Sequence, residues 1–181
     1  MPPIQVRPAT NADLPVLSVL DHGYSTDYVW QMTAREEEAS GETVITFRTA
    51  HLPRSVRVSS PRDPQRLAEV WKKRVCFLAA EEAGHLKGYI NLSVAAIPEV
   101  VWLADFCVDR RFRRCGVGTV LLAAAAHWAR ENHFARLVIE TQSKNYPAIC
   151  FALKNGLVFC GYNDRYYPHQ DVALFFGMTL K

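Results

Sequence analysis

Two kinds of hydrophobic pattern divide the chain near Val108. Before it, short runs rich in apolar and β-branched residues alternate with turn residues such as Gly84, which is typical of antiparallel strands joined by hairpins. Thr10 and Asp13 form a capping-box pattern just ahead of leucines spaced three apart, which predicts a short helix after the first strand. The expected strands cover residues 4–7, 28–58 as one hairpin, 75–80, 87–94 and 100–108, and a second short helix covers residues 65–73.

After Val108 the pattern changes to helices that alternate with strands. Helices are expected over residues 116–132 and 145–155, and strands over residues 136–141, 157–162 and 172–179. Parallel neighbouring strands need a crossover connection, so this order predicts a mixed sheet with helices on its faces. We expect an α/β fold in one domain that spans residues 1–181.

Composition narrows the class of protein only a little. The formal net charge of +3 suits an anionic cofactor and is far from the balance of a dedicated nucleic-acid binder. The longest apolar run, residues 117–126, is shorter than the ~20 residues needed to cross a bilayer, and no signal-peptide pattern opens the chain. We therefore expect a cytoplasmic protein without membrane contacts. Its five cysteines lie in apolar stretches without a C-x-x-C pair, which favours reduced thiols in or near the core.

The most informative segment is the basic, glycine-containing turn after Val108. Arg113, Gly116 and Gly118 lie where a strand ends and a helix begins. A helix start presents unpaired N–H groups and the positive end of the helix dipole, and glycine lets a large anion approach the backbone. The segment thus suits a pyrophosphate, although an ordinary loop with solvated arginines fits it equally well.

Other phosphate and metal motifs are absent from the sequence. No G-x-x-x-x-G-K-[ST] or G-x-G-x-x-G pattern occurs, and no histidine pair has the spacing of a metal site. The arginines of the turn could instead contact nucleic acid, but one short basic turn without an aromatic platform gives that reading little support. We expect no metal and no nucleic-acid partner.

Two motifs in register resemble the GNAT superfamily of N-acetyltransferases. Arg113, Gly116 and Gly118 match the cofactor motif [RQ]-x-x-G-x-[GA]. The second motif, N-x-x-A-x-x-[LF]-Y-x-x-x-G-[FL], is matched at Asn145, Ala148, Phe151, Gly156 and Leu157. The stretch 139–148 is also similar to the E-T-Q-x-x-N-x-P-A segment of streptothricin acetyltransferases, which suggests an amine acceptor and antibiotic modification.

The resemblance implies a GNAT-like mixed sheet, splayed open between the strands that end at Val108 and Thr141, with pantetheine in the gap. It implies acetyl-CoA as co-substrate and direct transfer of its acetyl group to a primary amine of a small molecule. Dimers are common in this class, so a homodimer fits the resemblance. The expected cofactor-binding residues are Phe106, Cys107, Val108, Arg113, Arg114, Cys115, Gly116, Val117, Gly118, Thr119, Asn145, Ala148 and Phe151.

The catalytic groups are less well marked. Asp105 and Glu140 lie near the ends of the two strands and could accept the amine proton, although a structural hydrogen bond or an exposed strand charge is the favoured interpretation of each. Many relatives carry a tyrosine seven residues after the motif asparagine as the acid for the leaving thiolate, and here that position is Ala152. Tyr166 and Tyr167, in the loop after the next strand, are the expected substitutes.

Three alternative functions remain at this point. The missing tyrosine and a missing strand carboxylate at Ala104 fit a CoA-binding or sensing module with weak or lost transfer. A protein amine could replace the small-molecule acceptor, since family does not fix substrate. A nucleic-acid-binding domain is the third alternative.

Overall fold

The computed structural model describes residues 3–37, 41–59, 66–167 and 171–180. The chain divides into two compact units, which are described separately below. The first unit contains residues 1–22, 59–139 and 176–181, and the second contains residues 23–58 and 140–175. By hydrogen bonding, a seven-stranded sheet has the order β1-β4-β5-β6-β7-β9-β8, and β2 and β3 form a separate two-stranded sheet.

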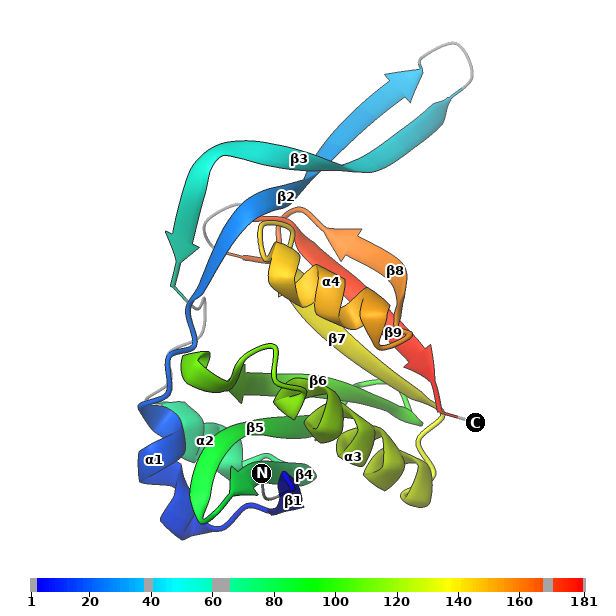
Figure 1. The fold of residues 1–181 in the computed structure, drawn as a ribbon. Coiled ribbons are helices and arrows are strands. Elements are labelled where there is room, and N and C mark those ends of the chain that lie inside the picture. Colours follow the sequence, from blue (N-terminus) through cyan, green and yellow to red (C-terminus); the bar gives the residue numbers. More distant parts are fainter. Residues whose placement is uncertain (1–2, 38–40, 60–65, 168–170, 181) are drawn as a thin grey trace. The chain divides into compact units, whose positions relative to one another are not determined.

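The first unit is built around antiparallel strands that carry helices (Figure 1). β1 pairs with β4, β4 with β5, and β5 with β6, all antiparallel. β7 and β9 each begin in one unit and end in the other. The elements are β1 (Gln5–Pro8), η1 (Asn11–Asp13), α1 (Leu14–Ser18), α2 (Leu67–Lys72), β4 (Cys76–Glu82), β5 (His85–Val94), β6 (Val100–Val108), η3 (Arg110–Phe112), α3 (Val117–Glu131), β7 (Arg136–Gln142) and β9 (Ala173–Thr179).

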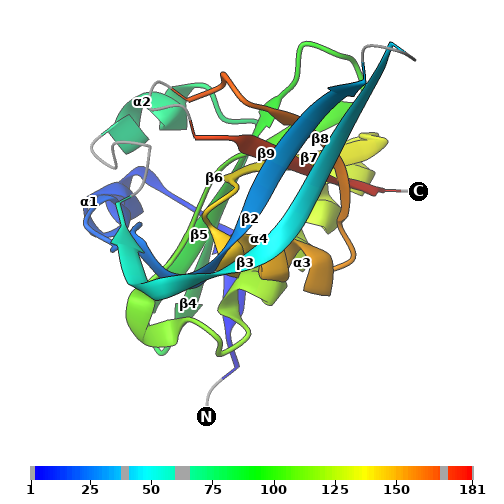
Figure 2. The same cartoon turned by 90° about the horizontal axis from the view of Figure 1, so that it is seen from above.

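Both faces of β4 and β5 are covered. Residues 76–80 and 87–92 are buried without interruption, whereas a strand covered on one face would alternate. On one face Phe77, Tyr89 and Cys107 pack against leucines of α1 and α2, and α3 lies on the other face (Figure 2). The expected helices on both faces of the sheet are therefore present.

β6 and β7 supply the parallel pairing that the sequence predicted. Their register runs from Val100 opposite Arg136 to Leu103 opposite Ile139. β6 continues from Leu103 to Val108, five residues beyond this register, and α3 is the crossover between the two strands. A parallel pairing that covers only the first part of β6 is the strand arrangement of the splayed sheet.

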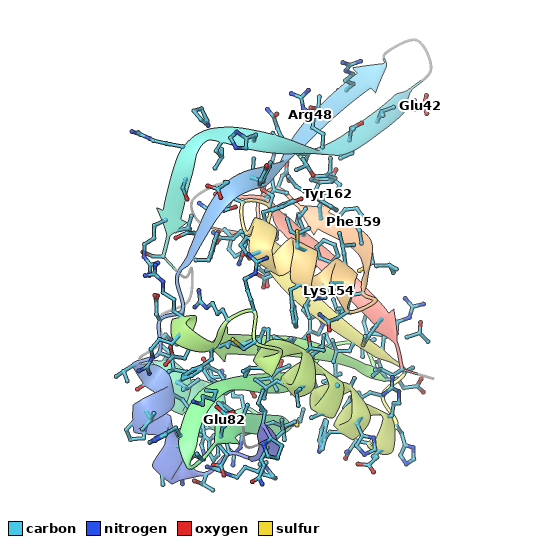
Figure 3. The ribbon with its side chains drawn as sticks, in the orientation of Figure 1. Glu42, Arg48, Glu82, Lys154, Phe159 and Tyr162 are labelled. Carbon is cyan, nitrogen blue, oxygen red and sulfur yellow. The ribbon has the colours of Figure 1, made fainter. Side chains whose placement is uncertain are left out.

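The second unit holds the hairpin and the C-terminal helix. The hairpin strands pair from Tyr24 opposite Val58 to Glu37 opposite Glu42, with a register shift near Thr26. An aromatic cluster joins the hairpin to β8, because the Phe47 ring lies 5.3 Å from Phe159 and 5.4 Å from Tyr162 (Figure 3). The elements wholly in this unit are β2 (Tyr24–Glu37), β3 (Glu42–Val58), α4 (Tyr146–Lys154) and β8 (Val158–Asn163).

The element order expected from the sequence is found, and two expectations need comment. The turn expected at residues 59–64 lies largely outside the described residues, as does the first residue of the helix expected over 65–73. The placement of all five cysteines in or near the core is wrong. Cys76 and Cys107 are buried, but three thiols are exposed, one in the turn before α3 and two on the outer sides of α4 and β8. These are Cys115, Cys150 and Cys160.

Candidate cofactor and catalytic site

The turn between β6 and α3 has an unusual backbone. Arg114 has a φ of 65° and Gly116 a φ of 87°, so two residues of the turn adopt the left-handed region. Gly116 is the N-cap of α3, and its carbonyl accepts from the N–H of Val120 at 3.1 Å. The N–H groups of residues 117–119 therefore stand at the open start of a 15-residue helix, where no intrahelical carbonyl precedes them. A helix start of this kind can hold an anion.

Two arginines of the turn make contacts within the protein. The Arg111 guanidinium lies 2.7 Å from the Asp109 carboxylate, and this hydrogen bond lowers the pKa of Asp109 from its usual value. Arg113 donates from Nε to the Val108 carbonyl at 2.9 Å and from a terminal nitrogen to the Asp21 carbonyl. Arg113, which the motif marks for cofactor binding, thus also links the turn to two backbone carbonyl oxygens by hydrogen bonds. The side chain of Arg114 is exposed.

Two residues of β5 pack against the end of β6 and the turn that follows it. Lys87 is 7% exposed, and its ammonium lies 3.4 Å from the Glu82 carboxylate and 3.4 Å above the Phe112 ring. A Cβ on Gly88 would lie 2.6 Å from the Cys107 carbonyl oxygen. Only glycine therefore allows β5 to approach the end of β6 this closely.

The Asp105 carboxylate belongs to a hydrogen-bonded chain inside the first unit. Its Oδ2 accepts from the Tyr89 hydroxyl at 2.7 Å, and its Oδ1 accepts from the Phe106 N–H at 2.9 Å. The Tyr89 oxygen also lies 2.8 Å from His22 Nε2, and His22 Nδ1 lies 2.7 Å from the Leu20 carbonyl. Asp105 is therefore fixed by side chains far away in the sequence.

Asn91 adds a polar side chain without a partner to the same sheet face. It pairs with Asp105 across β5 and β6, and cross-strand partners project from the same face. Asn91 is 1% exposed, yet neither its Oδ1 nor its Nδ2 has a hydrogen-bond partner among the described residues. Because buried amides are nearly always hydrogen-bonded, this amide indicates a place for a polar group that binds from outside the chain.

The thiol of Cys107 is unsuited to nucleophilic attack. It is 4% exposed, and burial raises its pKa to about 12, so it stays a neutral thiol at pH 7. Its Sγ lies 3.7 Å from the Asp21 carbonyl. Cys150 is exposed, so the expectation that apolar packing explains it does not hold.

In the second unit, Asn145 is the cap of α4. Its side-chain oxygen accepts from the Ala148 N–H at 3.2 Å, which satisfies one of the open amides at the helix start. Ala148 and Phe151 lie half-buried on this helix. The motif asparagine therefore has a structural task in addition to any contact with the cofactor.

Glu140 and Tyr167, two of the four expected catalytic residues, meet in the second unit. The Tyr167 hydroxyl donates to Glu140 Oε1. Tyr166 packs edge-on against Tyr167 with ring centroids 5.2 Å apart, and it is 47% exposed. Ala152, at the family's usual tyrosine position, is 0% exposed, so a phenol ring there would have to displace packed neighbours.

Sequence reasoning missed His22, Tyr89 and Asn91 as parts of a polar site. Tyr89 and Asn91 lie in an apolar strand and resemble core residues, and His22 lies in no motif. A polar residue within a buried strand was the available signal, since such groups need partners. Among the described residues, no group of three or more His, Cys, Asp or Glu side chains could hold a metal ion. No described helix is long and apolar enough to span a membrane.

Comparison with known proteins identifies the class. The model of the Acetyltransferase (GNAT) family matches residues 44–157, more than half of the chain, so the chain belongs to the GNAT family of acetyltransferases. Enzymes of this family use acetyl-CoA. The matched segment contains the turn before α3 and the start of α4.

The individual relatives named below are acetyltransferases. Streptothricin acetyltransferase A of Bacillus subtilis (strain 168) is 35% identical over 77 residues, which cover 40% of this chain and 44% of that protein. The matched part thus spans less than half of that relative. A crystal structure of nourseothricin acetyltransferase has a TM-score of 0.82 at 24% identity and covers 98% of this chain and 99% of its own.

A second solved structure was determined with a ligand. It is a protein of Bacillus anthracis str. Ames, assigned as a streptothricin acetyltransferase, in complex with acetyl coenzyme A. Its TM-score is 0.78 at 21% identity, and it covers 98% of this chain and 99% of its own. At these identities the two solved structures establish the fold, which is the GNAT fold expected from the sequence.

Proposed function

We propose that this chain transfers the acetyl group of acetyl-CoA to a primary amine of a small molecule, with streptothricin-type antibiotics as the acceptor class. The observation that carries the proposal is the turn before α3, whose left-handed Arg114 and Gly116 precede the open amides of residues 117–119. That turn lies inside the family segment. The acceptor class is supported by the named relative in Bacillus subtilis.

The proposed cofactor-binding residues begin with those of the turn. The amides of residues 117–119 would hold the pyrophosphate, and the exposed guanidinium of Arg114 would add a charge-assisted hydrogen bond. The other first-unit residues proposed for the cofactor are Phe106, Cys107, Val108, Arg113, Cys115, Gly116 and Gly118. The second motif adds the proposal of Asn145, Ala148 and Phe151.

Transfer requires the neutral form of the primary amine, because the protonated nitrogen has no lone pair for attack. The neutral nitrogen attacks the thioester carbon, the C–N bond forms, and the C–S bond breaks with its electron pair on the sulfur of CoA. Asp105 and Glu140 are the carboxylates proposed to receive the amine proton. Backbone N–H groups near Val108 would stabilise the oxyanion that develops on the thioester.

For the leaving thiolate, Tyr167 is a better proton donor than Tyr166. Tyr166 is 47% exposed, whereas the half-buried Tyr167 is held in one orientation by Glu140. That carboxylate also opposes loss of the phenol proton, because two adjacent negative charges repel each other. In the proposed mechanism, Tyr167 gives its proton to the thiolate after Glu140 has received one from the amine.

The test combines binding with turnover. Acetyl-CoA at 100 times its dissociation constant should stabilise the fold by ~2.7 kcal/mol. Thiol release from acetyl-CoA, measured with streptothricin and a panel of primary amines, should then reveal an acceptor. If saturating acetyl-CoA leaves the melting temperature unchanged, the cofactor assignment fails.

A second function is favoured by one observation. The buried Ala152 leaves no side-chain acid at the family's usual position, which fits a CoA-binding or sensing module with weak transfer. Such a module would show the thermal shift with acetyl-CoA but no thiol release with any amine in the panel.

A further inference from the structure

We propose that His22, Tyr89 and Asp105 form a proton-accepting chain that takes the proton of the acceptor amine. The inference deepens the proposed function, on which it rests, and it assigns roles to His22 and Tyr89 that no motif marks. All three residues lie in the first unit, so their arrangement is set within one compact part of the chain.

The hydrogen bonds of His22 fix its tautomer. The Leu20 carbonyl can only accept a hydrogen bond, so His22 Nδ1, 2.7 Å away, must carry a proton. The other ring nitrogen, Nε2, therefore has a lone pair when the ring is neutral and a second proton when the ring is cationic. It lies 2.8 Å from the Tyr89 oxygen.

The protons of the chain can then be counted. The Tyr89 hydroxyl has one proton and two close acceptors, namely Asp105 Oδ2 at 2.7 Å and the lone pair of neutral His22 at 2.8 Å. With a neutral ring and an ionised carboxylate, one of these two contacts has no proton and sets two lone pairs against each other. One additional proton completes both hydrogen bonds, so the chain is built to accept a proton.

Other charged and titratable groups near the chain do not supply that proton. The Arg113 guanidinium is permanently charged and donates to the Val108 and Asp21 carbonyls. Cys107, whose neighbours include Asp105, Asp21 and Arg113, remains a thiol at pH 7 because burial raises its pKa. The proton must therefore come from outside this group of residues.

The buried amide of Asn91 supports binding of a polar ligand beside Asp105. Its buried amide lies across the β5–β6 ladder from Asp105 and has no partner among the described residues. An ammonium group could donate to both Asn91 Oδ1 and the Asp105 carboxylate, whereas an apolar ligand would leave the amide unsatisfied. The amide thus favours an amine, or the water that carries its proton, as the occupant.

Proton transfer along the chain precedes attack on the thioester. The ammonium nitrogen gives one proton to Asp105, which then donates to the Tyr89 oxygen while Tyr89 donates to His22 Nε2. The neutral amine attacks the thioester, the C–N bond forms, and the C–S bond breaks with its electrons on sulfur. The nitrogen releases its second surplus proton as the thiolate takes one up from its own donor, and the chain later releases its proton to water. Asp105 is the catalytic residue, and Tyr89 and His22 are positioning residues that act through it.

The experiment measures kcat/KM against pH for wild type and for each variant, with the same amine. Because titration of the amine affects both proteins equally, it cancels in the ratio of variant to wild type. Asp105→Asn should lower kcat/KM by about 10²- to 10⁴-fold, the usual contribution of a general base. Tyr89→Phe and His22→Gln should each lower it by about tenfold and change the shape of the acid limb, since a lone carboxylate then accepts the proton. The dissociation constant of acetyl-CoA should stay within about twofold.

Matched controls separate this role from a structural one. Tyr162→Phe and His127→Gln make the same chemical changes at exposed residues outside the chain and should leave the profile unchanged. Because Tyr89 is fully buried, circular dichroism must show that its variant folds, and His22→Gln serves if it does not. Nitrogen-15 NMR of the imidazole should show a hydrogen-bonded lone pair on His22 Nε2 in wild type, and that signature should be lost in Tyr89→Phe at the same pH.

Two failures can be told apart. If wild type transfers acetyl to no amine, the proposed function falls and this inference falls with it. If wild type is active and the pH profiles of the folded Tyr89 and His22 variants are parallel to its own, the proton-accepting chain is overturned while the acetyltransferase assignment stands.

Discussion

A methyl group at Gly118 should separate stability from cofactor binding. Gly118 is the second residue of α3, and its φ is not among the positive values of the described chain, so alanine fits the backbone there. Alanine is better than glycine in a helix interior by about 1 kcal/mol. Gly118→Ala should therefore raise the stability of the free protein by up to ~1 kcal/mol, or roughly 2–4 °C in Tm for a chain of this size.

The same methyl group should weaken acetyl-CoA binding. The proposal brings the pyrophosphate against the amides of residues 117–119, where a side chain at Gly118 would intervene. A tenfold loss of affinity corresponds to about 1.4 kcal/mol. Gly116→Ala provides the contrast, because a Cβ there meets nothing within 4 Å but the φ of 87° strains any L-residue, by about 1–2 kcal/mol. That variant should lose stability and affinity together.

Thermal melts with and without acetyl-CoA, together with titration calorimetry, would measure both effects. For wild type, acetyl-CoA at 100 times its dissociation constant should raise Tm by about 5–10 °C. For Gly118→Ala, the free protein should melt higher and the ligand-induced rise at the same concentration should be smaller. A Gly118→Ala protein that binds acetyl-CoA as tightly as wild type would remove the pyrophosphate from this turn.

Three further predictions test other parts of the chain. The hydrogen bond from Arg7 lowers the pKa of Asp13 from 3.8 to about 2. About 2 kcal/mol of folding stability is therefore present above pH ~4 and should be lost as the pH falls to 2. Urea unfolding of Asp13→Asn should show the same loss already at pH 7. Gly88→Ala should cost about 1–3 kcal/mol in the same assay, because its Cβ meets a backbone oxygen at 2.6 Å, and an unchanged unfolding midpoint would contradict that contact. Tyr167→Phe should lower turnover by about 10²- to 10⁴-fold and Tyr166→Phe by much less; activity of both within about twofold of wild type would mean that water protonates the thiolate.

Local sequence patterns were sufficient for the elements of this fold. The strand expected over residues 100–108 has the same bounds in the structure, and the helix expected from Gly116 begins one residue later. In both cases short-range signals decide the structure, since hydrophobic periodicity sets the element and a glycine with positive φ ends the preceding turn. The family motifs could indicate the proposed cofactor turn because that turn is continuous in sequence.

The hydrogen-bonded chain proposed for proton transfer could not be predicted in this way. The contact between His22 and Tyr89 joins residues 67 positions apart, and that between Tyr89 and Asp105 joins residues 16 apart. No periodicity encodes such pairs, because they depend on which sheet face and which loop meet in three dimensions. For the same reason the motif did not reveal that Asn145 caps α4 and that Arg113 binds the Asp21 carbonyl.

Each unit contains a tyrosine that donates to a carboxylate, and the two pairs suit different steps. A phenol held by a carboxylate keeps its proton, since phenolate and carboxylate would repel each other. In the Tyr89–Asp105 pair, the ring of His22 lies on the far side of the phenol and offers a second acceptor, so a proton can enter at Asp105 and be shared along the chain. In the Tyr167–Glu140 pair, a proton that enters at Glu140 frees the phenol to give up its own. In the proposed mechanism, entry of a proton at a carboxylate is thus the common first event. The Tyr167–Glu140 pair would then protonate the leaving group in place of the family's tyrosine, whose position here is the buried Ala152.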